Sequence, residues 1–345
     1  MLTYPSPSQL HPQSQTLSQS KFQFPHMNLT HNDHLVWYLA TIQNGYLQAK
    51  HFAKRKSLDE RFVLRFGEQI ENCKSWAEEL KIAAQKLVDV HGTKLALFYS
   101  GGSDSEVVLR TLLGIGVIPE VHVIEFDEGL NAHEVKNAFE LCRANNIKPV
   151  VWHHDTMKYV KEHVYRDMAL TYHCSQIAYL TVLEYARRTD RPVIMGGEIY
   201  VQKHQHTEGG RVHDEASWYY IYREDEDGVT YRYSMATGHP VINEFFTYTP
   251  NLLYSWLVHP TIKSVMNNEV PGKLTLLSIK RKVYEQELGY NLTAQTKFHG
   301  YEALTWVNAF VQRELRAELP PTQTCRYEYN QLVTDLCCSQ PFSAN

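Results

Sequence analysis

Short apolar runs alternate with amphipathic stretches through the middle of this 345-residue chain. The apolar runs predict four buried strands, at 95–99, 121–126, 150–152 and 192–195. Apolar residues at helical spacing between them predict helices over 105–113, 132–145 and 173–187. Buried strands separated by helices are typical of βαβ units and a parallel sheet. The pattern therefore predicts an α/β fold, with a Rossmann-like parallel sheet sandwiched by helices.

The pattern changes before this core. Residues 1–30 are rich in Ser, Gln and Pro, and we expect a disordered arm because they offer few aliphatic side chains for burial. From Ser57 to Val90 apolar residues recur at helical spacing, which predicts one long helix or two in series. We therefore assign residues 31–92 to an N-terminal helical segment.

The pattern changes again after residue 200. Aromatic runs at 218–222 and 229–233 flank Asp227-Gly228, a turn sequence that predicts a β-hairpin. The remainder indicates helices and loops, including a late helix that begins near Leu304 and stops before Pro320. The expected organisation is a core at 93–200, a mostly helical extension on the substrate side at 201–325 that contains the hairpin, and a tail at 326–345.

Composition narrows the class of protein. Hydrophobic residues make up 43% of the chain and charged residues 21%, with a net charge of -4, so no basic excess favours nucleic acid as a partner. None of the 6 Cys forms a CxxC pair, which favours free thiols over a zinc or iron–sulfur site. No apolar run approaches the roughly 20 residues of a membrane span. Residues 1–24 lack the charged and apolar regions of a secretory signal, so we expect a cytoplasmic protein.

The strongest chemical signal is the sequence Leu97-Phe98-Tyr99-Ser100-Gly101-Gly102-Ser103-Asp104-Ser105, in which an apolar strand leads through two glycines into a helix. Glycines let the backbone approach a ligand closely, and the helix start directs N–H groups at an anion. A carboxylate at Asp104 would repel phosphate, unless it holds Mg²⁺. The alternative is a plain turn in which Ser103 or Asp104 caps the helix. A Walker loop is excluded, because no Gly-Lys-Ser/Thr follows.

This hexapeptide, 100–105, resembles the Ser-Gly-Gly-x-Asp-Ser signature of the PP-loop, or N-type, ATP pyrophosphatases, over roughly residues 93–200. The resemblance implies a HUP-type sheet that binds ATP and Mg²⁺. It also implies that a substrate oxygen attacks the α-phosphate and releases pyrophosphate, which the loop holds. Pyrophosphate would be bound by the loop residues Ser100, Gly101, Gly102, Ser103 and Ser105, with Asp104 as a metal ligand.

The later sequence is more loosely similar to known proteins. Residues 245–250, 280–284 and 297–302 resemble phage-encoded members of this superfamily that are described as PAPS-reductase-like or asparagine-synthase-like. PAPS is phosphoadenosine phosphosulfate. A phage origin would place the protein in the host cytoplasm. The match names no substrate.

Three further segments contain candidates for the site. Phe126 ends the second strand, which lies beside adenine in the family that the chain resembles; a solvated acidic loop is the alternative. Gly196 and Gly197 end the fourth strand on the same edge as the phosphate loop, and Glu198 follows them as a second metal ligand or a substrate contact, or as a surface residue of a tight turn. Lys282, from a basic cluster, would stabilise charge on the phosphates, unless it is an ordinary helix-surface lysine.

Three activities compete. The first is an ATP-dependent enzyme that adenylates a carbonyl or carboxylate of a small-molecule substrate, with Asp104, Glu198 and Lys282 as its catalytic residues. The second is a PAPS-reductase-like enzyme, which the absence of a Glu-Cys-Gly context disfavours, and the third is a nucleotide-binding protein without catalysis. We favour the first and leave open whether the protein forms a homo-oligomer. Because the loop should be exposed, we expect Asp104→Ala to abolish turnover with little loss of folding stability.

Overall fold

The computed structural model describes residues 36–37, 47–50, 63–66, 70, 72–197, 199–208, 211–223, 225–243, 245–267, 276–289, 291–293, 305–319 and 324–338. The predicted arm at 1–30 and the candidate residue Glu198 lie outside these ranges. Among the described residues, none belongs to a helix whose length and apolar character would suffice to cross a membrane.

A five-stranded parallel sheet forms the centre of the molecule, as the sequence predicts. Its strands, in spatial order, are β10 (Val241–Ile242), β7 (Val193–Ile194), β4 (Ala96–Phe98), β5 (Glu120–Phe126) and β6 (Val150–His154). The fifth strand, β10, lies beyond the predicted end of the core at residue 200. Chain order reverses between β4 and β7, and ligands in open α/β sheets bind beyond the carboxyl ends of the strands at such a point.

Two hydrophobic cores lie on opposite faces of the sheet, and alternate side chains of the short strands point into one or the other. In β4, Leu97 belongs to the first core, whereas Ala96 and Phe98 belong to the second. β7 repeats this division with Ile194 and Val193. Because successive side chains of a strand point to opposite faces, strands this short contribute to both cores. The sheet is therefore covered by helices on both faces, which confirms the predicted α/β sandwich.

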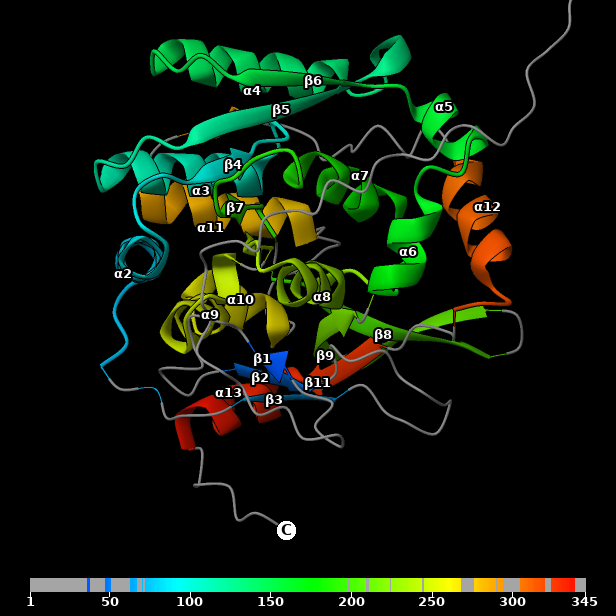
Figure 1. Ribbon diagram of the computed structural model, residues 1–345. Helices are drawn as coiled ribbons and strands as arrows, with labels where there is room; N and C mark the ends of the chain where they lie inside the picture. Colours follow the sequence, from blue (N-terminus) through cyan, green and yellow to red (C-terminus); the bar gives the residue numbers. More distant parts are fainter. Residues whose placement is uncertain are drawn as a thin grey trace, which may run out of the picture.

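The helices divide between these cores. Those contributing to the first core are α2 (Trp76–His91), α3 (Ser103–Gly114), α4 (Ala132–Ala144), α9 (Pro250–Leu257), α10 (Pro260–Met266), α11 (Leu276–Leu288) and α13 (Tyr329–Cys338). Those contributing to the second are α5 (Thr156–Lys161), α6 (Arg166–Tyr172), α7 (Ile177–Ala186), α8 (Asp227–Thr237) and α12 (Thr305–Leu315). Short 3₁₀ turns lie at Asp127–Gly129 (η2) and Phe245–Thr247 (η3). Figure 1 shows α11 alongside α3, beneath β4.

Two small antiparallel sheets lie at the end of the molecule opposite α4 (Figure 1). One pairs β1 (Val36–Trp37), β2 (Leu47–Lys50) and β3 (Val63–Phe66). The other pairs β8 (Val201–Glu208), β9 (Arg211–Arg223) and β11 (Thr324–Glu328). The C-terminal part is therefore mostly helical with an antiparallel hairpin, as predicted.

The predicted helix over Ser57–Val90 is wrong in its first half. Val63–Phe66 is strand β3, which pairs with β2, and the helix α2 begins only at Trp76. Its start is fixed by Ser75, which exchanges hydrogen bonds with Glu78 in a capping box. Four residues are too few to distinguish the helical period from the strand period. Pairing with β2 decides that Val63–Phe66 is a strand.

The hairpin is present, but its position differs from the prediction. Residues 229–233 lie in helix α8, and the strand β9 pairs instead with β8 and β11. Val229 and Tyr233 are four residues apart and both are buried in the second core, as one helical face requires. The Asp227-Gly228 turn signal therefore marks the start of a helix.

The predicted helix over 173–187 begins four residues later, at Ile177. His173 adopts a left-handed conformation with φ 58°, which ends the preceding helix α6. The sequence analysis missed α5 and α6, because both are too short to show a clear period.

Candidate functional site

The predicted phosphate loop, Ser100–Ser105, lies where β4 ends and α3 begins, beside the reversal in strand order. Gly101 has φ +86°, and a Cβ built on it would lie 1.9 Å from the carbonyl oxygen of Glu134 in α4. Only glycine fits there, because the backbone of α4 leaves no room for a side chain. Gly102 is the N-cap of α3 and, having no side chain, cannot cap the helix itself. The first-turn N–H groups of α3 are thus left for another acceptor.

Serine hydroxyls hold the loop in shape. The backbone N–H of Gly102 donates to Ser100 Oγ at 3.2 Å, and Ser105 Oγ lies 3.1 Å from the same oxygen. Ser105 also donates to the carbonyl oxygen of Gly102 at 3.0 Å. Ser105 is buried, Ser100 is exposed and Ser103, the first residue of α3, is half-buried. The exposed Ser100 and the half-buried Ser103 therefore lie on either side of the helix start.

The glycine pair after β7 packs against this loop, as the sequence predicts. A Cβ built on Gly196 would lie 3.0 Å from the backbone nitrogen of Ser105, so the two loops touch through their backbones. Gly197 turns the chain with φ 63°. Glu198 follows directly but lies outside the described residues, so its assignment as a metal or substrate ligand stays a prediction.

Both carboxylate oxygens of Asp104 are bound by helix α11. Lys280 Nζ donates to Oδ2 at 2.8 Å, and the Tyr284 hydroxyl donates to Oδ1 at 2.7 Å. The side chain of Asp104 is 14% exposed and that of Lys280 is 2% exposed. The expectation that Asp104 is an exposed loop residue is therefore wrong. Its carboxylate is part of a largely buried ion pair that joins α3 to α11.

The described residues do not fit a metal ion at Asp104 as they stand. Among them, no group of three or more His, Cys, Asp or Glu side chains is placed to hold a metal. Both carboxylate oxygens of Asp104 also already accept hydrogen bonds, one of them from an ammonium group. The predicted role of Asp104 as a Mg²⁺ ligand stays a prediction.

Helix α11 presents a different lysine from the predicted one. Lys282 is exposed on the outer face, whereas Lys280 is buried and reaches the loop. The helical period contains the signal that distinguishes them, since Lys280 shares a face with Tyr284, four residues on, and Lys282 does not. The predicted catalytic role of Lys282 is untested by these contacts, but Lys280 is the member of the basic cluster that touches the loop.

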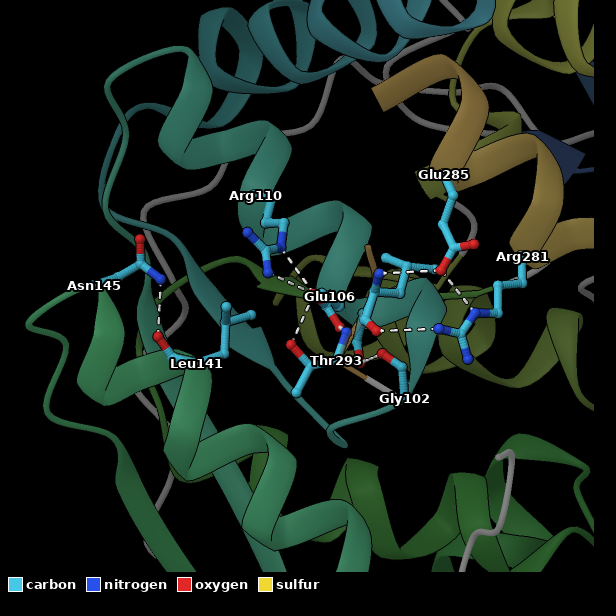
Figure 2. Close-up of polar contacts among 10 residues, drawn as sticks. Gly102, Glu106, Arg110, Leu141, Asn145, Arg281, Glu285 and Thr293 are labelled. Atoms are coloured by element: carbon cyan, nitrogen blue, oxygen red, sulfur yellow. Dashed lines mark hydrogen bonds and ion pairs between the residues drawn. The ribbon is translucent and has the colours of Figure 1, made fainter. Parts of the chain in front are cut away.

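A second set of contacts fixes the segment 291–293 over the start of α3 (Figure 2). Glu106 is fully buried and accepts from Arg110 at 2.8 Å. It also accepts from the Thr293 backbone N–H at 2.9 Å and the Thr293 hydroxyl at 3.2 Å. Glu285 of α11 accepts from Arg281 at 2.7 Å. It also accepts from the backbone N–H of Leu292, the residue before Thr293, at 3.3 Å. The loop helix and α11 are thus joined at two places.

The candidate nucleoside contact at the end of β5 is occupied by another residue of the chain. The backbone N–H of Phe126 donates to Asn131 Oδ1 at 2.9 Å, and Asn131 Nδ2 donates to the carbonyl oxygen of Ile124 at 2.8 Å. The Phe126 ring is buried against His154. Phe126 stays a predicted contact, and the sequence analysis missed Asn131, which closes this strand end.

His154, at the end of β6, gives a prediction for the pH dependence of stability. It is 4% exposed, and burial lowers its pKa from 6.5 to about 4, although Asp127 and Asp155 favour the charged form. The unfolded chain therefore binds more protons between these values, so the free energy of unfolding falls as the pH drops from about 6.5 towards 4. We expect a loss of about 2 kcal/mol between pH 7 and pH 4.5 that is attributable to His154.

Urea unfolding at the two pH values measures this effect. His154→Gln cannot titrate and should reduce the pH dependence by that amount. Equal slopes in the wild type and His154→Gln would contradict the assignment.

Comparisons with known proteins add little to this geometry. No family model matches the sequence, and no curated protein matches it either. Among solved structures, NMN synthetase from Francisella tularensis is similar at 11% sequence identity and a TM-score of 0.28, over 71% of this chain and 95% of that chain. So distant a likeness does not bear on substrate or reaction. What the structure itself establishes is the α/β fold and a glycine-built helix start at its point of strand reversal.

Proposed function

We propose that this chain binds ATP with the loop Ser100–Ser105 and cleaves the bond between its α- and β-phosphates, transferring the adenylyl group to a carbonyl or carboxylate oxygen of a small substrate. The observation that carries the proposal is the start of α3. It begins at a glycine beyond the carboxyl end of β4, beside the strand reversal, in a loop that matches the pyrophosphatase signature.

The electrostatics of this helix start suit an anion. The helix dipole contributes roughly half a positive charge at the N-terminus, and the N–H groups of the first turn supply directed donors. Gly101 and Gly196 let the loop pack closely against α4 and the chain after β7, which sets the shape of the helix start. Ser100 and Ser103 carry further hydroxyl donors at the same place.

These groups favour pyrophosphate as the leaving group. When a substrate oxygen forms a bond to the α-phosphorus, the bond to the bridging oxygen breaks and its electron pair passes to pyrophosphate. Donors that are already fixed around the β- and γ-phosphates stabilise this growing charge without reorganising. The products are the adenylated substrate and pyrophosphate, and a nucleophile then displaces AMP.

The test is an incubation with ATP, MgCl₂ and a metabolite extract, with AMP, ADP and pyrophosphate measured by mass spectrometry. We expect AMP and pyrophosphate, and a loss of at least about ten-fold in the Ser100→Ala/Ser105→Ala protein, since each hydroxyl contributes about 1 kcal/mol. Thr334→Ala removes a comparable hydroxyl from α13, where it donates to the Asn330 carbonyl, and should change nothing.

The products separate the alternatives. ADP and phosphate as sole products, or AMP formation that the double variant leaves intact, would overturn the proposal. Consumption of PAPS with a thiol reductant, without ATP turnover, would favour the reductase. Binding of ATP without turnover in any extract would favour a nucleotide-binding protein.

A further inference from the structure

We propose that the Lys280 ammonium neutralises Asp104 in place of a divalent cation, so that polyphosphate binds the loop Ser100–Ser105 without a metal. This inference rests on the proposed function, because it assumes that the loop binds polyphosphate. It answers the difficulty that Asp104 poses, since a free carboxylate in the first turn of α3 would repel the ligand.

The contacts of Asp104 carry the first step. One oxygen accepts from the Lys280 ammonium at 2.8 Å and the other from the Tyr284 hydroxyl at 2.7 Å. A buried ammonium needs an anionic partner, because its own hydration is lost. A metal ion on Asp104 would have to displace this ammonium or lie close to its positive charge, and both are unfavourable.

The rigidity of α11 carries the second step. Tyr284 is 1% exposed and its ring stacks on Trp76 of α2, with centroids 5.0 Å apart and planes at 2°. Phe246 stacks against the same ring at 5.8 Å. Lys280 lies one helical turn before Tyr284 on the same face. The aromatic stack therefore fixes Tyr284 at Asp104 and, through α11, the backbone position from which Lys280 reaches the same carboxylate.

The charges around the loop carry the third step. Glu106 and Glu134 are buried near the same glycines, and Arg110 binds Glu106 at 2.8 Å. A Cβ built on Gly102 would lie 3.9 Å from Glu134 Oε1, so a second carboxyl group borders the loop. With acidic groups this close, an unneutralised Asp104 would weaken anion binding strongly. Lys280 prevents that without a metal.

The experiment is calorimetric titration with inorganic pyrophosphate, in EDTA and in MgCl₂. The quantity compared between variants is the ratio of the two dissociation constants, so that the effect of Mg²⁺ on pyrophosphate itself cancels. For the wild type we expect dissociation constants within about three-fold of each other. Lys280→Met leaves the Asp104 charge in place, so its binding in EDTA should weaken at least about ten-fold and recover with Mg²⁺.

Two further variants make the result decisive. Lys263→Met removes an exposed lysine from α10 and should behave as the wild type. Asp104→Ala/Lys280→Met removes both charges and should again bind without metal, even where Lys280→Met alone fails to fold. Wild-type binding that needs Mg²⁺, or a double variant that needs it, overturns this inference and leaves the proposed function standing. No pyrophosphate binding in either buffer overturns both.

Discussion

Gly101→Ala should abolish pyrophosphate binding and lower the free energy of unfolding by about 2–5 kcal/mol. Two costs combine in that figure. A non-glycine residue with positive φ costs about 1–2 kcal/mol, and the new Cβ would also lie 1.9 Å from the Glu134 carbonyl oxygen. Backbone atoms cannot rotate away as a side chain can, so the loop must leave α4, at a cost of roughly 1–3 kcal/mol.

Gly116→Ala is the matched control for this prediction. Gly116 has φ +80°, but a Cβ there meets nothing within 4 Å. It should therefore lose only the conformational part, about 1–2 kcal/mol, and keep its affinity for pyrophosphate. Urea unfolding and calorimetric titration of both proteins give the comparison. Equal losses of stability, or retained binding in Gly101→Ala, would contradict the loop geometry.

Asp104→Ala should destabilise the fold by about 3–5 kcal/mol, in contrast to the small loss that the sequence alone suggests. Removing one partner of a buried ion pair is strongly destabilising, because the other charge loses an interaction that offset its desolvation. Here the ammonium of Lys280, 2% exposed, loses the carboxylate on which it donates at 2.8 Å. A typical domain has only 5–15 kcal/mol of stability in total, so a large part of it would be lost.

A double-mutant cycle measures this coupling. Asp104→Ala/Lys280→Met replaces the pair by apolar side chains. It should recover about 2 kcal/mol or more of the lost unfolding free energy, because both charges of the pair are gone. The unfolding free energies of the two single variants and the double variant, measured in urea, give the interaction energy. Additive losses would mean that the ion pair contributes little, and that Asp104 acts through the loop alone.

The two predictions matter for any study of activity. A loss of turnover in Asp104→Ala alone would not distinguish a catalytic carboxylate from a structural one, because the same substitution weakens the fold. Comparison with the double variant separates these roles. Turnover that returns with stability would identify Asp104 as a residue that positions α11, whereas turnover that stays absent would show a direct part in the reaction.

Local signals determined much of this molecule. The sequence predicts strands β4 to β6, the helices between them and the turn at Ser100–Ser105. Each of these depends only on a short hydrophobic period or on glycine at a turn. The sequence also predicts that Gly196 lies near this loop, since the carboxyl ends of parallel strands share one edge of the sheet. These features are fixed within a few residues of chain.

Only the tertiary structure decided the rest. Lys280 lies 176 residues from Asp104 in the chain, and the sequence pattern alone did not reveal which lysine of the cluster faces the loop. The division of 57–90 into strand and helix, and the helix at 229–233, depended on partners that lie far away in the sequence. The hydrophobic period of a short segment is compatible with both helix and strand. Burial and pairing with elements that are distant in the sequence determine which of the two forms. The sequence by itself therefore determined the α/β core and the glycine turn at Ser100–Ser105, and only the packing of α11 decided that Lys280 and Tyr284 contact Asp104.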